Sequence, residues 1–160
     1  MRIIIPSNNG TRFTSNIDIM FVIDNSISMI ANDCENGTKR IDVVKKDCEY
    51  IMKEFAGARF SVVSFNDKSQ MLIPFTKDYD MAIETVKNIQ IIDELYAKGS
   101  SLNVPKDTII DILKRTDKDK ERTKVIFFIS DGEITSDEKL ESYKELNKYN
   151  TNHINHSFSA

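Results

Sequence analysis

Three oxygen-bearing side chains follow one apolar segment of the chain, two residues apart from one another. Residues 17–23 are almost unbroken in their apolar character and rich in strand-forming types, and they lead directly into Asp24, Ser26 and Ser28. A buried strand that ends in this way delivers polar groups to the rim of a sheet, where open α/β sheets place their sites. A carboxylate and two hydroxyls at this position can hold a ligand through oxygen, and a strand-end Asp can also serve as a nucleophile.

Two further segments carry oxygen donors that the fold should bring to the same rim. Residues 123–130 form a second apolar strand that ends at Asp131, and the loop 99–102 contains Ser100 just before a predicted helix. Taken singly, Asp-Asn-Ser and Asp-Gly are common turn sequences, and the structural interpretation of Ser100 is a helix N-cap. The coincidence of all three segments at equivalent places in the fold favours a shared site.

Helices and strands alternate along the rest of the chain. A helix over residues 40–55 has its apolar side chains at helical spacing, and Pro74 places the strand 70–75 at a sheet edge because proline cannot donate to a ladder. Strands separated by helices of this length predict an α/β fold with a doubly wound, mainly parallel central sheet, helices on both faces and one antiparallel edge strand. The other predicted elements are a strand over 58–65, helices over 78–89 and from Pro105 through Leu113, a helix carrying Leu140, Tyr143 and Leu146, and a last strand from Ile154.

Length, composition and charge limit the classes of function. The chain has 160 residues, of which 40% are hydrophobic and 29% charged, and this fits one domain that buries a substantial core. The net charge of -3 is spread without a basic region, so we expect no nucleic-acid partner. No apolar run reaches the length of a membrane span, so we expect no membrane insertion by this segment.

The cysteines and histidines have structural interpretations. Cys48 falls on the inward face of the 40–55 helix, which favours a buried thiol over a disulfide with Cys34. The only two histidines lie on the final segment, where a surface role is favoured over catalysis or metal binding.

Three further acidic residues, Asp18, Asp33 and Glu133, lie on or near the segments that carry the candidate site. We interpret Asp33 as a turn residue rather than a second carboxylate near the site, and Glu133 as exposed on its loop rather than close to a ligand. Asp18 lies near the start of the first apolar strand, and the sequence pattern offers no account of it.

Together, the motifs resemble a von Willebrand factor type A domain that carries a metal-ion-dependent adhesion site, known as a MIDAS. The similarity covers residues 16–160, leaves 1–15 as an N-terminal extension and implies the Rossmann-like fold of that family. Because the family normally continues past the last strand into a further helix, we expect the domain to be truncated at its carboxyl end. The residues that carry the resemblance are Asp24-x-Ser26-x-Ser28, Gly99-Ser100 and Asp131-Gly132-Glu133.

The sequence around residues 29–33 and the run 57–76 further resemble bacterial members of this family. Some of those members are held outside the membrane by flanking helices that this sequence lacks. The extracellular face of a membrane-anchored bacterial protein is therefore the suspected location, with the cytoplasm as the alternative.

The resemblance implies a divalent cation, Mg²⁺ with Mn²⁺ or Ca²⁺ as alternatives, at the rim of the sheet. Such a cation keeps an open position that accepts a Glu or Asp carboxylate from a partner protein. The implied function is a metal-dependent protein-binding or adhesion module without catalysis, monomeric as an isolated domain. In the family's terms the direct ligands are Ser26, Ser28 and Ser100, and Asp24 and Asp131 act largely through coordinated water.

Two positions depart from the family pattern. Ser100 stands where the family usually has Thr, which keeps the hydroxyl and loses the methyl group. Ile27 replaces the small residue often found between the two serines, and its bulk is expected to narrow access to the ion.

An enzyme and a metal-free scaffold are the alternatives. Residues 21–24 and the polar residues after them also resemble haloacid-dehalogenase phosphatases, in which a strand-end Asp such as Asp24 is the nucleophile and Mg²⁺ helps to bind phosphate. Those enzymes place a second Asp two residues further on, and Ser26 at that position removes the proton-transfer group. The intact Asp24, Ser26, Ser28 and Asp131 argue against a scaffold that binds partners without an ion.

Overall fold

Five strands of the part of the chain that the structure describes form a central sheet. The computed structural model describes residues 16–93, 103–116, 121–131, 144–149 and 151–157. Its strands are β1 (Ile17–Asp24), β2 (Arg59–Phe65), β3 (Ser69–Thr76), β4 (Thr123–Ser130) and β5 (Thr151–Ser157). Its helices are α1 (Arg40–Glu54), α2 (Tyr79–Lys87) and α3 (Lys106–Arg115), with short 3-10 segments η2 (Ile27–Ile30), η3 (Glu35–Gly37) and η4 (Lys144–Tyr149).

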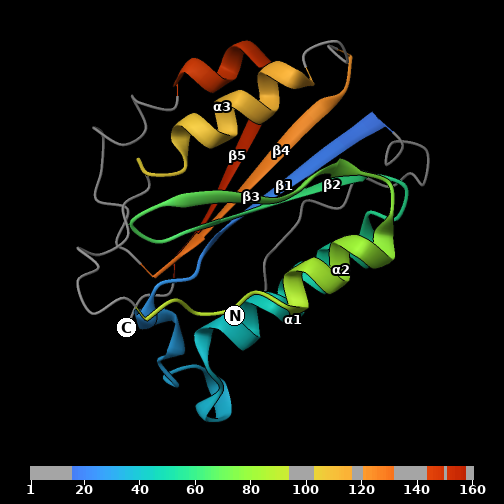
Figure 1. Ribbon diagram of the computed structural model, residues 1–160. Helices are drawn as coiled ribbons and strands as arrows, with labels where there is room; N and C mark the ends of the chain where they lie inside the picture. Colours follow the sequence, from blue (N-terminus) through green and yellow to red (C-terminus); the bar gives the residue numbers. More distant parts are fainter. Residues whose placement is uncertain (1–15, 94–102, 117–120, 132–143, 150, 158–160) are drawn as a thin grey trace.

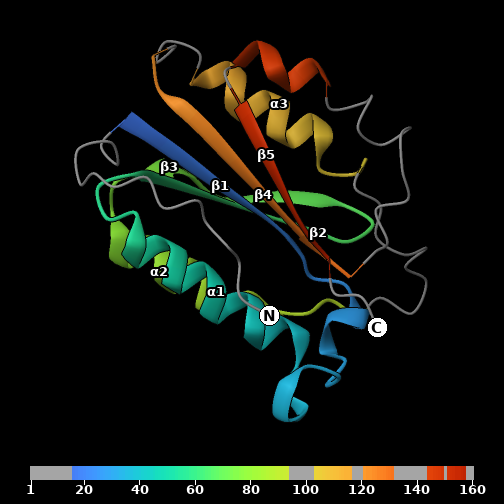
Figure 2. The same cartoon turned by 180° about the vertical axis from the view of Figure 1, so that it is seen from behind.

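Helices cover both faces of this sheet (Figures 1 and 2). On one face α1 and α2 pack against apolar side chains of β1 and β2, with Phe21 stacked between Phe60 and Phe127. On the other face α3 and η4 enclose a second cluster that includes Met20, Val22 and Leu113. Because alternate residues of β1 contribute to the two clusters, the strand is buried on both faces, as its nearly continuous apolar sequence predicts.

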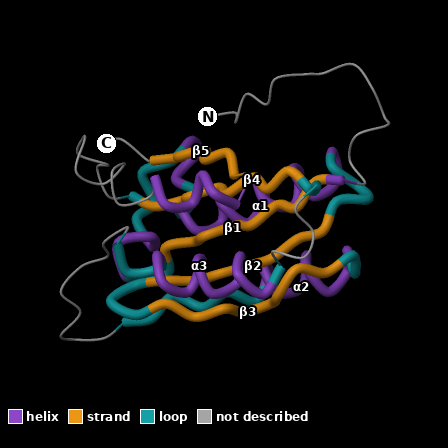
Figure 3. The backbone as a smooth tube through the Cα atoms, turned by 90° about the horizontal axis from the view of Figure 1, so that it is seen from above, coloured by secondary structure: helices purple, strands orange, loops and turns teal. Residues whose placement is uncertain are grey.

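The strands lie in the order β3-β2-β1-β4-β5 (Figure 3). The pairs of β1 with β2, β1 with β4, and β4 with β5 are parallel, whereas β3 runs antiparallel to β2 at one edge. This arrangement confirms the predicted doubly wound, mainly parallel sheet and the edge position of the strand that contains Pro74.

Local sequence signals explain where several elements begin and end. The Asp78 side chain accepts a hydrogen bond from the Met81 N–H at 3.0 Å and caps the first turn of α2. Asn36 and Gly37, in the loop before α1, both have positive φ, a backbone conformation that glycine and asparagine adopt more readily than other residues. Cys48 is buried on the inner face of α1 and both cysteines are free, so the preference for a thiol over a disulfide is confirmed.

Some predictions differ from the structure or fall outside the described residues. The last strand begins at Thr151, earlier than the predicted Ile154, and buried Leu146 lies in the 3-10 segment η4. The N-terminal extension 1–15 and most of the predicted helix that carries Leu140 and Tyr143 lie outside the described residues. None of the helices within the described ranges is long and apolar enough to cross a membrane.

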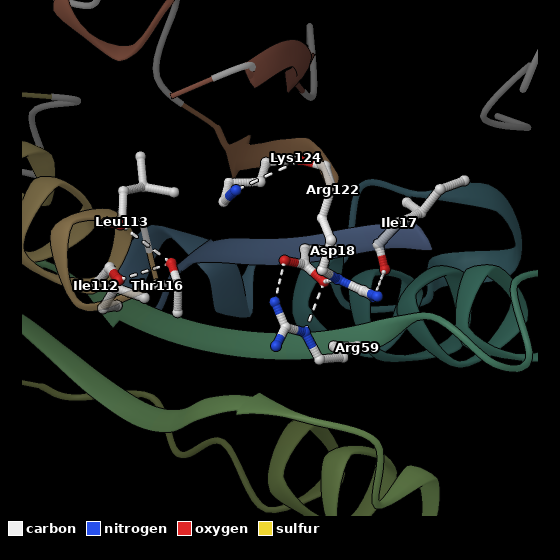
Figure 4. Close-up of polar contacts among 8 residues, drawn as sticks. All are labelled: Ile17, Asp18, Arg59, Ile112, Leu113, Thr116, Arg122 and Lys124. Carbon is white, nitrogen blue, oxygen red and sulfur yellow. Dashed lines mark hydrogen bonds and ion pairs between the residues drawn. The ribbon is translucent and has the colours of Figure 1, made fainter. Parts of the chain in front are cut away.

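At the amino end of the sheet, Asp18 is fully buried and paired with two arginines (Figure 4). Arg59 on the neighbouring strand donates to both Asp18 carboxylate oxygens, at 2.8 and 2.6 Å. Arg122, just before β4, donates to Oδ1 at 2.7 Å and also to the Ile17 carbonyl at 3.0 Å. Asp18 therefore ties together the starting ends of three adjacent strands, which accounts for a charged residue within an apolar strand.

Candidate metal centre

Asp24 is fully buried at the carboxyl end of β1, next to the end of β4. The register pairs Ile23 with Ile129, which brings Asp24 beside Ser130. The Ser130 hydroxyl donates to Asp24 Oδ2 at 2.8 Å, and the main-chain N–H of Ser26 donates to Oδ1 at 2.9 Å. The carboxylate is thus fixed in orientation at the rim where the sheet ends (lower left in Figure 1).

The two predicted hydroxyls lie side by side just beyond Asp24. Ser26 and Ser28 have their Oγ atoms 2.9 Å apart and share a hydrogen bond. Ser26 is buried and Ser28, in η2, is exposed, so the pair runs from the interior to the surface. Two oxygen ligands at right angles around Mg²⁺, each at about 2.0 to 2.1 Å, are separated by about 2.8 to 3.0 Å. The hydroxyl pair therefore fits two adjacent positions of an octahedral cation.

Asn25 holds the segment between these oxygen donors in place. Its N–H donates to the Phe65 carbonyl at 2.8 Å, and its own carbonyl accepts from the Ile92 N–H at 3.0 Å. Its side-chain amide also donates to the Gln90 carbonyl at 3.1 Å. The exit of β1 is therefore tied to the end of β2 and to the segment after α2, which limits movement of the serines.

Asp131 lies one residue beyond β4 at the same edge, and Arg40 binds it. Arg40 Nη1 donates to Asp131 Oδ2 at 2.9 Å, while Nε donates to Asp33 Oδ1 at 2.8 Å and Nη2 pairs with Asp33 Oδ2. The Arg40 guanidinium beside Asp33 lowers the pKa of that carboxyl below its ordinary value. Asp33 is therefore more than a turn residue, because it reaches the predicted site through Arg40.

Four of the five predicted site residues thus lie at one edge of the sheet, at the ends of β1 and β4. The fifth, Ser100, and also Glu133 lie outside the described residues, so their predicted roles stay predictions. No group of three or more His, Cys, Asp or Glu side chains suited to a metal occurs among the described residues. The predicted donor set contains only two carboxylates and relies on hydroxyls.

Ser130 and Arg40 are site residues that the sequence interpretation did not assign. The signal for Ser130 was present, because a serine ending the strand beside β1 falls in register with Asp24. The sequence gives less indication of the role of Arg40, because its partners Asp33 and Asp131 are 7 and 91 residues away from it along the chain.

A match to a known family covers this edge of the sheet. Residues 19–133 match the family model described as the von Willebrand factor type A domain. The chain belongs to the von Willebrand factor type A domain family. The matched span runs from β1 past Asp131, so it includes the ends of both strands that carry the candidate centre.

Solved structures show that the fold of this von Willebrand factor type A domain recurs in proteins of distant sequence. BatB from Bacteroides thetaiotaomicron, a conserved hypothetical protein, matches with a TM-score of 0.66 at 18% identity, covering 87% of this chain and 65% of BatB. The von Willebrand factor domain of the type V pili tip protein Mfa5 from Porphyromonas gingivalis matches with a TM-score of 0.57 at 21% identity, covering 72% of this chain and 38% of that chain. Proximal thread matrix protein 1 from the mussel byssus matches with a TM-score of 0.69 at 14% identity, covering 90% of this chain and 38% of that chain. The chain therefore spans less than two thirds of each of these structures.

Proposed function

We propose that this domain is a divalent-metal-dependent protein-binding module whose cation accepts an acidic side chain from a partner protein. The observation that carries the proposal is the Ser26–Ser28 hydroxyl pair, with Oγ atoms 2.9 Å apart in front of the buried Asp24. This separation and this donor chemistry suit a hard cation of octahedral preference. Mg²⁺ is the proposed ion, with Mn²⁺ or Ca²⁺ as alternatives.

Each residue has a distinct part in the proposed site. Ser26 and Ser28, with Ser100 as a third hydroxyl, would bind the cation directly, while Asp24 and Asp131 would hold it through water. Asp24 supplies negative charge from the interior, and the hydrogen bonds from the Ser26 N–H and the Ser130 hydroxyl keep the carboxylate in one orientation. When bound, a cation neutralised mostly through water would supply an electrophilic contact for the partner's carboxylate.

Exposed apolar side chains beside the hydroxyls support a protein partner. Ile27 and Ile30 in η2 are 48% and 38% exposed, and Ile92, which forms a β-bridge with Ser26, is 40% exposed. Exposed apolar groups next to a polar contact are typical of surfaces that bind other proteins. The family includes a pilus tip domain among its solved structures, which agrees with an adhesive role.

We further propose that the domain has no catalytic activity of its own. The residue two positions after Asp24 is Ser26, whose hydroxyl is hydrogen-bonded to Ser28, so a phosphatase mechanism would lack its usual carboxyl proton donor. A phosphatase assay with a generic ester and Mg²⁺ should show no turnover. Turnover that disappears in Asp24→Asn would replace this proposal with an enzymatic one.

Calorimetric titration of Mg²⁺ and Mn²⁺ into chelator-treated protein tests the metal site. One site is expected in the wild type, and Asp24→Ala and Ser26→Ala should abolish or strongly weaken it. Thr85→Ala, which removes a hydroxyl bonded to the Met81 carbonyl within α2, is the matched control and should bind like the wild type. Circular dichroism checks that each variant is folded. Equal heats in wild type and in folded Ser26→Ala would reject the site.

A further inference from the structure

Arg40 places a positive charge within the candidate metal centre. Its guanidinium donates to Asp131 at 2.9 Å on one side and to both carboxylate oxygens of Asp33 on the other. The Arg40 side chain is only 12% exposed and that of Asp131 11%, whereas that of Asp33 is 44% exposed. The arginine therefore lies between an inner carboxylate at the rim and an outer carboxylate that faces solvent.

The backbone fixes Arg40 in this position. Arg40 is the first residue of α1, and its main-chain N–H donates to the Ala31 carbonyl at 2.9 Å, which ties the helix start to the end of η2. A cation at a helix N-terminus is disfavoured by the helix dipole, and a mostly buried one also loses hydration. The two carboxylates offset both costs, so Asp33 as well as Asp131 stabilises the charged Arg40 in this mostly buried position.

We propose that Arg40 is an internal competitor of the metal ion for Asp131, and that Asp33 limits this competition by neutralising Arg40 from outside. The proposal rests on the metal site proposed above. Asp24, Asp131, Asp33 and Arg40 together carry a formal charge of about −2 at neutral pH, which one divalent cation balances. The Asp33–Arg40 pair thus sets how strongly the centre attracts an ion, although neither residue is a proposed ligand.

Breaking the same ion pair from its two sides has opposite consequences. Asp33→Asn leaves Arg40 with Asp131 as its partner and adds net positive charge to the centre, so ion affinity should fall by about three- to tenfold. Arg40→Gln releases Asp131 and removes the positive charge, so ion affinity should rise by a similar factor of about three to ten. A pair that served only to position the loop would lower ion affinity when broken from either side.

The test is a calorimetric titration of Mg²⁺ into the wild type, Asp33→Asn, Arg40→Gln and the double variant, all at low salt. Two matched control variants make the same changes of formal charge at positions far from the candidate metal centre. Glu49→Gln breaks the Glu49–Lys53 pair on α1 and corresponds to Asp33→Asn, and Arg115→Gln at the exposed end of α3 corresponds to Arg40→Gln. Both controls should bind Mg²⁺ with wild-type affinity, and thermal unfolding of the metal-free proteins checks that all six chains are folded.

The outcomes separate this inference from the proposed function. Weaker binding in Asp33→Asn, tighter binding in Arg40→Gln and a double variant that follows Arg40→Gln support the competition. Shifts in the same direction, or no shift in either variant, overturn the competition and leave the metal site intact. Absence of binding in the wild type overturns both.

Discussion

Strand β1 carries a fully buried aspartate near each end, and the two carboxylates are held in different ways. Asp18 at the amino end accepts hydrogen bonds from the guanidinium groups of Arg59 and Arg122. These contacts connect β1 to the starting ends of β2 and β4. Asp24 at the carboxyl end accepts from the Ser130 hydroxyl and the Ser26 N–H, and it lies behind the Ser26–Ser28 pair. The two aspartates of β1 therefore have different roles: Asp18 connects neighbouring strands, and Asp24 supplies negative charge at the carboxyl edge of the sheet.

The largest expected effect is on stability, at the amino end. Asp18→Asn keeps the shape of the side chain but leaves two mostly buried arginines facing each other, so the free energy of unfolding should fall by about 3 kcal/mol. Urea unfolding of the metal-free protein measures this loss. Asp111→Asn on the exposed face of α3 is the control, and a loss in Asp18→Asn no greater than that of the control would show that the ion pair does not hold the strands together.

A smaller effect on stability, with a large effect on binding, is expected at the other end. Ser28→Ala removes an exposed hydroxyl whose hydrogen-bond partner within the described residues is Ser26, and it should cost about 1 kcal/mol of stability or less. The same variant should lose most of its affinity for Mg²⁺, whereas Asp18→Asn, if folded, should keep it. Calorimetric titration of Mg²⁺ into both variants decides whether the two ends of β1 differ in function. Equal losses of Mg²⁺ affinity would show that they do not.

The two cysteines should differ in reactivity, because one lies in the interior and the other lies in a loop near the rim. Burial, with a smaller contribution from Asp47, raises the pKa of the Cys48 thiol far above its ordinary value, while Cys34 is half-buried in the loop beside Asp33. We expect a thiol reagent at neutral pH to label Cys34 first and to reach Cys48 only on unfolding. Mass spectrometry of the labelled peptides shows the order, and rapid labelling of Cys48 in the folded protein would contradict the packing of α1.

The smallest expected effect concerns pH at the rim. Arg40 lowers the pKa of Asp33 from an ordinary value of 3.8, so the stability contributed by their pairing is present above that value and is lost as the pH falls through the lowered pKa. An NMR titration of the Asp33 carboxyl should give a lowered midpoint in the wild type and an ordinary one in Arg40→Gln. The same midpoint in both proteins would rule out the pairing in solution.

The sequence predicted most elements that position the site because their signals are local. Alternating polarity, apolar runs and Pro74 can each be recognised within a single segment. The carboxyl ends of neighbouring parallel strands lie at the same edge of the sheet, so the strands alone place Asp24 and Asp131 together, whatever contacts these two side chains make. Asp18 had no explanation in the sequence because its partners lie 41 and 104 residues away. Asp33 was interpreted wrongly for a related reason, since its role depends on where one long arginine side chain lies.

The central claim is that the hydroxyls of Ser26 and Ser28 bind a divalent cation in front of Asp24. Anomalous diffraction from a crystal grown with Mn²⁺ measures the position of such an ion directly. The account predicts a peak within coordination distance of both serine Oγ atoms, at the carboxyl ends of β1 and β4. Crystals that hold Mn²⁺ elsewhere, with both hydroxyls still bonded to each other and no peak beside them, would contradict it.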